Sequence, residues 1–300
     1  MSFDLSIAFD KAEYLTPQIY LLVDTLKDNL PKDTILHVIT NRSRKNPEIK
    51  YIKDNIPCKI YIKRKDNKLN SRCNYMYKSF EIDTDKEWVI KIECDLLILK
   101  NLKNIEKLLK QPYDLFIGQE CRKMIDDDNI ELRVWRNIYK DLEVKMPTKK
   151  ITYIENKKKG LPLYDTSIII VKSKWLDYIN KNWVPMTEKC EKWMHLNIHP
   201  NEFAFTALIH KGNINHKLFN PNIYDFNPIS HFRKGEFPSQ ELIDNPIIPD
   251  DVEILQYHRP WWLKRICESN PKIKEIVENS NIGDWLNTRV DISEYVEKTG

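Results

Sequence analysis

Residues 88–105, WVIKIECDLLILKNLKNI, form an apolar run that is interrupted by two acids and then resumes. The run Trp88–Ile92 predicts a buried strand, and Glu93, Cys94 and Asp95 follow it directly. On an extended chain residues i and i+2 point to the same face, so Glu93 and Asp95 project together while Cys94 points into the core. Two acids between buried runs are costly unless something compensates them. A divalent cation is the compensation that this pattern favours over a merely solvated strand end.

Short apolar runs alternate with helix-patterned segments on both sides of this stretch. The predicted strands are residues 5–9, 34–40, 59–62, 88–92, 114–118, 166–172 and 253–257. The predicted helices are residues 16–30, 70–82, 102–109, 173–180 with Ser173 as N-cap, and 201–210, with one or two more after residue 271. This alternation predicts an α/β fold with a mainly parallel central sheet flanked by helices.

Residues 121–159 interrupt the alternation, because they are polar, charged and only weakly periodic. We interpret them as a helical excursion followed by a mobile loop, whose run Lys157–Lys159 is either a solvated loop or a lid over the ligand. The chain shows no internal repeat and no low-complexity linker. One domain over residues 1–268 with a helical tail over residues 269–300 is therefore the simplest organisation.

Composition places the chain among ordinary globular proteins, with 41% hydrophobic and 31% charged residues in a length of 300. A net charge of +4, from 48 basic and 44 acidic side chains, argues against a nucleic-acid binder but allows a basic cleft for a phosphorylated ligand. Six scattered cysteines without a CxxC pair indicate free thiols in a reducing compartment. With no signal-peptide pattern and no apolar run near the ~20 residues of a membrane span, we expect a cytoplasmic enzyme, of the kind that bacteria make or that viruses and phages encode in a host cytoplasm.

The stretch around Glu93 and Asp95 resembles the DxD motif of GT-A fold glycosyltransferases, most closely the glycogenin and galactosyltransferase-like (family 8-like) nucleotide-diphospho-sugar transferases. That motif is followed in the family by "l-v-l-k-d-l", and this chain has LLILKNL. The resemblance continues in order over roughly residues 5–263, through SIAFDKAEY, GLPLYDTSIIIVKS, HPNEFAFTALIHKG and ILQYHRPWW. It implies a single GT-A-like (Rossmann-like) domain.

The resemblance also implies how the donor nucleotide is bound. Ala8 and Asp10 would line the nucleoside pocket, and Tyr14 would stack on the base. Lys78 resembles the basic residue of the family that faces the donor phosphates. Arg72 is a secondary candidate for the same task, because a guanidinium pairs well with phosphate oxygens.

A metal site is implied by the acids and by the histidine of the last motif. Asp95 and His258 would bind the cation, and Glu93 would reach it directly or through water. A mixed carboxylate–imidazole site suits Mn²⁺ better than Mg²⁺, which prefers oxygen ligands. The cation would act as a Lewis acid on the diphosphate that leaves during transfer.

Asp165, Thr166 and Ser167 would lie beside the donor sugar, and Glu202 is the acid best placed to work near the acceptor. Asp165 and Thr166 come from the motif that in the family reads "p-y-f-N-s-G", and Glu202 from "D-Q-x-x-l-N". Glu202 and Asp165 are therefore the candidate catalytic residues, with Glu202 as a base in an inverting enzyme or as an orienting group in a retaining one. Alternatively, Glu202 is only a helix N-terminal acid favoured by the helix dipole. Phe203 departs from the family, where Gln is usual.

The other histidines offer little chemistry by sequence alone. His195 and His199 could form a second site, but neither has an evident carboxylate partner in the sequence. We interpret them as surface or packing residues.

The sequence thus predicts a metal-dependent glycosyltransferase that moves a sugar from a nucleotide-diphosphate sugar, such as a UDP-sugar, to a hydroxyl of a glycan, protein or other acceptor. A nucleotidyltransferase is disfavoured because the loop DKAEY lacks glycine. Two alternatives stay open. One is a sugar transferase or binding protein directed at nucleic acid, acting on modified DNA bases. The other is a non-catalytic sugar-nucleotide-binding relative, because Glu93 and Phe203 depart from the family pattern.

Overall fold

The computed structural model describes residues 2–10, 15–63, 76–120, 128–153, 158–194, 199–225, 248–257, 260–280 and 282. The strands are β1 (Phe3–Phe9), β2 (Leu36–Thr40), β3 (Cys58–Ile62), β4 (Trp88–Ile92), β5 (Leu96–Ile98), β6 (Leu115–Gln119), β7 (Ile151–Thr152), β8 (Lys159–Gly160), β9 (Tyr164–Lys172), β10 (His216–Leu218) and β11 (Ile254–Gln256). The helices are α1 (Leu15–Asn29), α2 (Pro47–Asn55), α3 (Glu106–Leu109), α4 (Asp128–Asp141), α5 (Leu176–Glu191), α6 (Pro200–Lys211), α7 (Pro221–Tyr224), α10 (Pro260–Ser269) and α11 (Pro271–Glu278), with 3₁₀ turns η1 (Met76–Phe80), η2 (Leu102–Ile105) and η3 (Ser173–Trp175).

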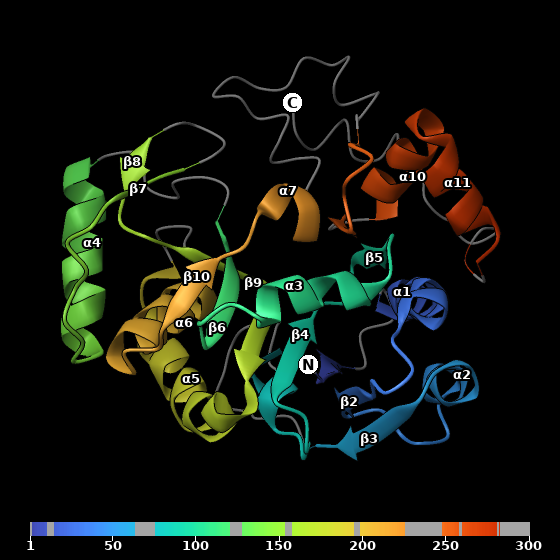
Figure 1. The fold of residues 1–300 in the computed structure, drawn as a ribbon. Coiled ribbons are helices and arrows are strands. Elements are labelled where there is room, and N and C mark those ends of the chain that lie inside the picture. Colours follow the sequence, from blue (N-terminus) through green and yellow to red (C-terminus); the bar gives the residue numbers. More distant parts are fainter. Residues whose placement is uncertain are drawn as a thin grey trace.

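A seven-stranded sheet crosses the molecule in the order β10-β6-β9-β4-β1-β2-β3, with helices on both sides (Figure 1). All its neighbouring strands are parallel except β9, which runs antiparallel to both β4 and β6. A separate antiparallel pair joins β5 to β11, and β7 pairs with β8. The predicted α/β fold with a mainly parallel central sheet is confirmed.

The strand order reverses between β1 and β4. The chain first adds β2 and β3 on one side of β1, and then returns to place β4 on the other side. In open α/β sheets ligands bind outside the carboxyl ends of the strands at such a switch point. Here the last residue of β4, Ile92, pairs with Ile7 near the end of β1. Asp10 and Glu93 therefore leave the sheet at the same edge and at this switch point.

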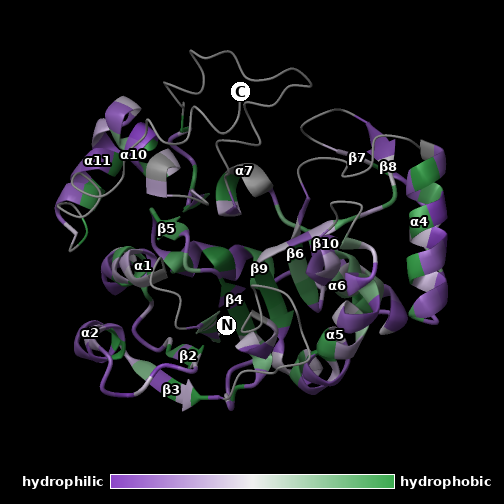
Figure 2. Cartoon of the chain, turned by 180° about the vertical axis from the view of Figure 1, so that it is seen from behind, coloured by the Kyte–Doolittle hydropathy of each residue, from purple (hydrophilic) through white to green (hydrophobic). Residues whose placement is uncertain are grey.

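Both faces of the sheet are buried, as strand β9 shows. Ile168 and Ile170 pack with the residues of α1, α2 and α3, while Ile169 and Val171 pack with α4, α5 and α6. Alternate side chains thus enter two separate cores, which is why the run is apolar at every position. Figure 2 shows the same strands as the most hydrophobic part of the chain. The edge of the sheet is left as the place where polar groups gather.

Three predicted helices need correction. Ser173 is not an N-cap: it lies inside η3 and its hydroxyl donates to the Lys86 carbonyl, and the helix that follows runs on to Glu191. The helix predicted over residues 70–82 is a 3₁₀ turn where the chain is described, at Met76–Phe80. The helix predicted over residues 102–109 is divided into η2 and α3. Short segments packed on a sheet need no full helix, because tertiary contacts stabilise them.

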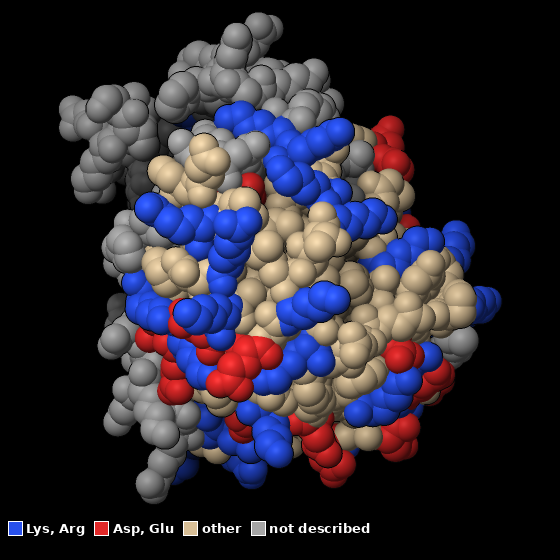
Figure 3. All heavy atoms as spheres, turned by 90° about the vertical axis from the view of Figure 1, so that its left-hand side faces the viewer, with Lys and Arg blue, Asp and Glu red and all other residues tan. Residues whose placement is uncertain are grey.

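The helical excursion predicted in the polar segment 121–159 is confirmed by α4. The short antiparallel pair of β7 and β8 was not predicted. Lys158 and Lys159 are exposed there, and so are Lys145, Lys149 and Lys150. Figure 3 shows this face of the molecule, where basic side chains are intermixed with uncharged and acidic ones. Lys157 lies outside the described residues, so the proposed lid stays a prediction.

The C-terminal part packs as helices α10 and α11. Ile266, Ile273 and Val277 share a core with Leu21 of α1 and Leu97 of β5. The predicted helices after residue 271 are thus confirmed by α11, whereas α10 was not predicted. The boundary between residues 1–268 and a tail over 269–300 stays a prediction. Within the described ranges no helix is long and apolar enough to cross a bilayer.

Free thiols are confirmed for Cys58, Cys94, Cys190 and Cys267. Cys73 and Cys121 lie outside the described residues.

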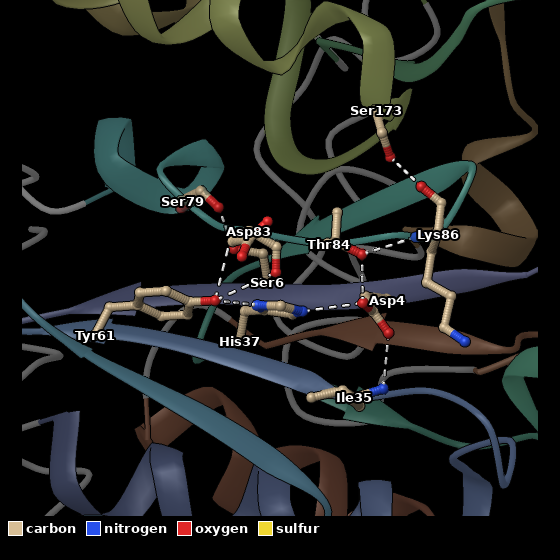
Figure 4. A network of polar contacts seen from close by, with 10 residues as sticks. All are labelled: Asp4, Ser6, Ile35, His37, Tyr61, Ser79, Asp83, Thr84, Lys86 and Ser173. Atoms are coloured by element: carbon tan, nitrogen blue, oxygen red, sulfur yellow. Dashed lines mark hydrogen bonds and ion pairs between the residues drawn. The ribbon is translucent and has the colours of Figure 1, made fainter.

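A buried polar network connects β1 with β2, β3 and the segment that precedes β4 (Figure 4). His37 of β2 contacts Asp4 of β1 (Nε2 to Oδ2, 3.0 Å) and the hydroxyl of Tyr61 of β3 (3.0 Å). Asp4 also accepts from the Thr84 hydroxyl (2.6 Å) and from the Ile35 amide (2.9 Å). Burial raises the pKa of Asp4, but these hydrogen bonds outweigh it and hold the pKa below its usual value. The folded state therefore favours the ionised form of the Asp4 carboxylate.

We predict that Asp4→Asn lowers the free energy of unfolding by about 2–3 kcal/mol at pH 7, since hydrogen bonds to a buried charge are lost. Because the folded-state pKa is lowered, this contribution is present above the unfolded pKa of about 3.9 and is lost as the pH falls through the lower folded value. Urea unfolding at pH 7 and at pH 3 measures it. The exposed Asp33→Asn is the control. An equal difference in the free energy of unfolding between the natural chain and Asp4→Asn at both pH values would contradict an ionised Asp4 in the folded state.

Candidate functional site

The site is built where β1 and β4 end. Asp10 follows β1, and its backbone carbonyl accepts a hydrogen bond from Nε of Arg42 (2.8 Å). Arg42 comes from the segment after β2, is 3% exposed, and pairs with Glu48 of α2 (2.7 Å). Arg42 thus holds the backbone of Asp10 directly after β1. Arg42 lies in no motif of the sequence, so this role was not predicted.

The two acids of the motif follow β4, with Asp165 of β9 nearby. Cys94 is buried, as the alternation predicted. Burial raises the pKa of Glu93, and the charges of Asp95 and Asp165 add to the rise while Lys91 opposes it. Mutual repulsion of this kind means that the three carboxylates lie close together and create one region of negative potential. Such a region favours the binding of positive charge.

One positive charge is already present, on Lys91 of β4. Its side chain is 1% exposed, and its ammonium contacts Oε1 of Glu93 at 2.9 Å. The same ammonium donates to the Thr166 and Ser167 carbonyls of β9. Lys91 was read only as part of an apolar strand, although its spacing of two residues from Glu93 places both side chains on one face.

Glu202 lies in the first turn of α6 and is paired with His199. Nδ1 of His199 lies 2.9 Å from Oε1 of Glu202. Oε2 of Glu202 is buried and has no hydrogen-bond partner within the described part of the chain. Burial raises the pKa of Glu202 although His199 opposes it, and Glu202 in turn raises the pKa of His199 to about 9. The interpretation of His199 as a residue without a carboxylate partner was wrong.

Two further acids, Glu120 and Asp225, join the cluster from β6 and α7, and the sequence did not indicate either. Burial raises the pKa of Asp225, and Asp165, Glu93, Asp95 and Glu120 add to it. Oδ2 of Asp225 lies 3.4 Å from the position that a Cβ on Gly118 would take. Because Gly118 pairs with Asp165 in the β6–β9 ladder, Asp225 reaches the same corner of the sheet.

Strand β11 brings the segment before His258 to the motif. The amide of Tyr257 donates to the Asp95 carbonyl (3.1 Å), and Gln256 donates from Nε2 to the Ser167 hydroxyl (2.8 Å). His258 itself lies outside the described residues, as do Tyr14 and Arg72. Their predicted roles stay predictions.

The remaining predicted residues have these surroundings. Ala8 lies near the end of β1, paired with Ile39. Lys78 lies in η1 with its ammonium 3.8 Å from Glu81. The Thr166 hydroxyl is buried and accepts from Asn201 Nδ2 (2.9 Å). Phe203 is a core residue, stacked on Trp135 with ring centroids 4.2 Å apart. The structure therefore brings Thr166 beside the carboxylates but leaves Lys78 with a partner of its own.

The described side chains supply the right chemistry for a divalent cation without completing its site. Among the described residues, no three His, Cys, Asp or Glu side chains are arranged to hold a metal ion. Carboxylate oxygens are nevertheless present, and buried oxygens of Glu202 and Asp225 have no described hydrogen-bond partner. Hard cations such as Mn²⁺ and Mg²⁺ take such ligands. These oxygen donors suit such a cation, and the role of His258 as a further ligand stays a prediction.

We predict that the stability conferred by the His199–Glu202 pair depends on pH on the alkaline side. A ring whose pKa is raised to about 9 stabilises the folded state fully below the unfolded value of about 6.5, and this is lost as the pH rises through 9. The difference in Tm between the natural chain and His199→Gln should therefore shrink between pH 6.5 and 9.5.

His216→Gln is the matched control, because burial lowers the pKa of His216 and its contribution should not change over that range. A constant difference for His199→Gln would contradict the pairing.

Comparison with known proteins gives a match in structure alone. No protein-family model and no curated protein sequence matches the chain. Among solved structures, the galactosyltransferase LgtC with donor and acceptor sugar analogues has a TM-score of 0.55 at 14% identity, over 93% of this chain and 96% of that one. Mouse xyloside xylosyltransferase 1 has a TM-score of 0.53 at 11% identity, over 86% and 98%. GlyE of Streptococcus pneumoniae TIGR4 has 0.53 at 14% identity, over 92% and 63%. The chain therefore has the GT-A fold of the glycosyltransferases that it matches.

Proposed function

We propose that the chain is a glycosyltransferase that moves a sugar from a nucleotide-diphosphate sugar to a hydroxyl acceptor, with a divalent cation held by Asp95 and His258. The observation that carries the proposal is the hydrogen bond from the Tyr257 amide to the Asp95 carbonyl (3.1 Å). This hydrogen bond places Tyr257 beside Asp95, and Tyr257 is the residue directly before the predicted ligand His258 in the sequence. The predicted ligands come from distant segments, so this approach is not a consequence of local sequence.

The nucleotide end of the donor is assigned to the switch point between β1 and β4. Ala8 lies near the end of β1 and Asp10 directly follows that strand, and Arg42 holds the Asp10 carbonyl. Nucleotides bind at this point in open α/β sheets because the crevice between diverging segments is free of crossing connections. The diphosphate would then point toward Asp95, with Tyr14, Lys78 and Arg72 as further contacts.

The cation, when bound, supplies positive charge that stabilises the leaving diphosphate. The protein's own part is to hold the backbone of Asp95, whose carbonyl accepts a hydrogen bond from the Tyr257 amide (3.1 Å). Tyr257 directly follows β11 and is 1% exposed. Asp95 is the direct ligand in this scheme, and Glu93 is a helper because Lys91 already occupies one of its oxygens.

Glu202 is the group best suited to handle the acceptor. Oε1 is held by His199, and Oε2 is a buried oxygen without a described partner. In an inverting enzyme Oε2 would accept the proton of the acceptor hydroxyl, and in a retaining enzyme it would orient the donor sugar. Asp165 contributes to the same field, and its carboxylate is fixed by the Ser167 amide (2.7 Å).

We expect a UDP-sugar to raise the Tm of the chain only when Mn²⁺ is present, because a ligand that binds the folded state alone stabilises it. A thermal-shift screen of nucleotide sugars, each with Mn²⁺ and with EDTA, measures this and identifies the base. Free UDP, free sugar and UMP are the controls for which part of the donor is bound. No shift with any nucleotide sugar would contradict the proposal.

We expect Asp95→Asn and His258→Gln each to lower donor turnover by at least about 100-fold, equivalent to roughly 2.7 kcal/mol of lost transition-state stabilisation. Unfolding by urea checks that both variants are folded. Asp54→Asn, an exposed change on α2, is the matched control. Full activity of either site variant, or undiminished activity in EDTA, would contradict the proposed metal-dependent mechanism.

A second candidate, a non-catalytic sugar-nucleotide-binding protein, is favoured by one observation. Phe203 is buried against Trp135, so position 203 offers no polar group to the site, where a glutamine is usual in the resembling family. Release of UDP from a donor that has been shown to bind separates the two candidates. Binding without any release, in the presence of varied acceptors, would favour the second.

A further inference from the structure

The pairing of β9 with β6 contains an irregularity next to the site. Ile117 pairs with Ile169, but the next residue of β6, Gly118, pairs with Asp165. The three residues of β9 between these partners, 166–168, have no partner on β6. The pairing with β4 also stops at Ile169, opposite Lys91. Buried backbone carbonyls in such a bulge need hydrogen-bond donors from elsewhere.

Lys91 supplies those donors. Its ammonium donates to the Thr166 carbonyl and contacts the Ser167 carbonyl at 3.4 Å. Its third contact is Oε1 of Glu93, at 2.9 Å. An ammonium has three donors and no acceptor, so these contacts account for the whole group. Since only 1% of the side chain is exposed, Lys91 is a fixed internal cation rather than a group that reaches for a phosphate.

The segment that Lys91 holds connects the walls of the site. The Ser167 amide donates to Asp165, the Thr166 hydroxyl accepts from Asn201 of α6, and the Ser167 hydroxyl accepts from Gln256 of β11. Gln256 in turn pairs with Leu96, the residue after Asp95. The motif, the bulge, α6 and β11 therefore form one connected set of contacts, and Lys91 contributes the positive charge in it.

We infer that Lys91 is a positioning residue that stabilises the β9 bulge and keeps Glu93 in an ion pair. A divalent cation then binds to Asp95 without direct coordination by Glu93. This inference rests on the proposed function, because it concerns the cation of the same site. The Lys91–Glu93 pair is charge-neutral, so it adds little to the attraction for a cation. Removing only Lys91 or only Glu93 changes the attraction of the site for a cation, and the direction of that change identifies the role of Lys91.

The test measures Mn²⁺ binding to the full chain without nucleotide, by the EPR signal of free Mn²⁺. Lys91→Met leaves Glu93 unpaired and should tighten Mn²⁺ binding by about tenfold, since one nearby positive charge is removed. Lys91→Arg keeps the charge and should bind Mn²⁺ as the natural chain does. Lys50→Met, an exposed change on α2, is the control for charge at a distance.

The decisive variant removes both partners. Lys91→Met with Glu93→Gln replaces a buried ion pair by neutral groups of similar size, a change that folds often tolerate. It should restore Mn²⁺ affinity to within about threefold of the natural chain, while kcat falls because the bulge loses its donors. A Glu93 that binds the metal directly would instead make this double variant bind Mn²⁺ far more weakly than the natural chain.

The outcomes separate the inference from the proposed function. Mn²⁺ binding that is unchanged or weaker in Lys91→Met, or weak in the folded double variant, would overturn the role of Lys91 alone. A natural chain that binds no Mn²⁺ would overturn the metal site as a whole. Should Lys91→Met fail to fold, Lys91→Arg and the double variant still test the role of Lys91, because neither leaves an unpaired charge at positions 91 and 93.

Discussion

Burial of both faces of the central sheet is the constraint on which the rest of the structure depends. Strand β4 is covered on both sides, and its side chains alternate between two apolar cores. A charge within such a strand is costly unless the protein itself neutralises it. Lys91 meets this condition only because its long side chain runs to the strand end, where Glu93 and the β9 carbonyls surround the ammonium. Within β4, charge is therefore confined to the carboxyl end of the strand.

The antiparallel strand β9 determines how that edge is shaped. Because it runs against its neighbours, its first residues lie at the edge where β4 and β6 end. Asp165 and Thr166 are thereby placed beside Glu93, and α6 follows with Glu202 and Asn201. An entirely parallel sheet would have put the amino end of this strand on the opposite edge. The carboxylates meet because one strand is reversed.

The fold was largely predictable because apolar runs of the right length mark buried strands. The site was predictable where chemistry and position coincide, as at Glu93 and Asp95, which directly follow such a run. It was not predictable where a residue acts at long range. The partner of Lys91 on β9, the hydrogen bond from Arg42 to Asp10 and the approach of Asp225 to Gly118 all depend on strand order. Strand β5 was missed because three residues are too few to show a period, and its pairing with β11 is what stabilises it.

The β5–β11 pair has a consequence for how the protein forms. It joins segments about 160 residues apart, and contacts of such long range are closed slowly because the loop entropy is lost before the contact is gained. Among the residues that the structure describes, the last one in the seven-stranded sheet is Leu218, so these seven strands can pair before β11 is synthesised. During translation the N-terminal part folds first. In a nascent chain the strands of the sheet and the acids Glu93, Asp95, Asp165 and Glu202 are therefore synthesised before Tyr257, whose amide later donates to the Asp95 carbonyl.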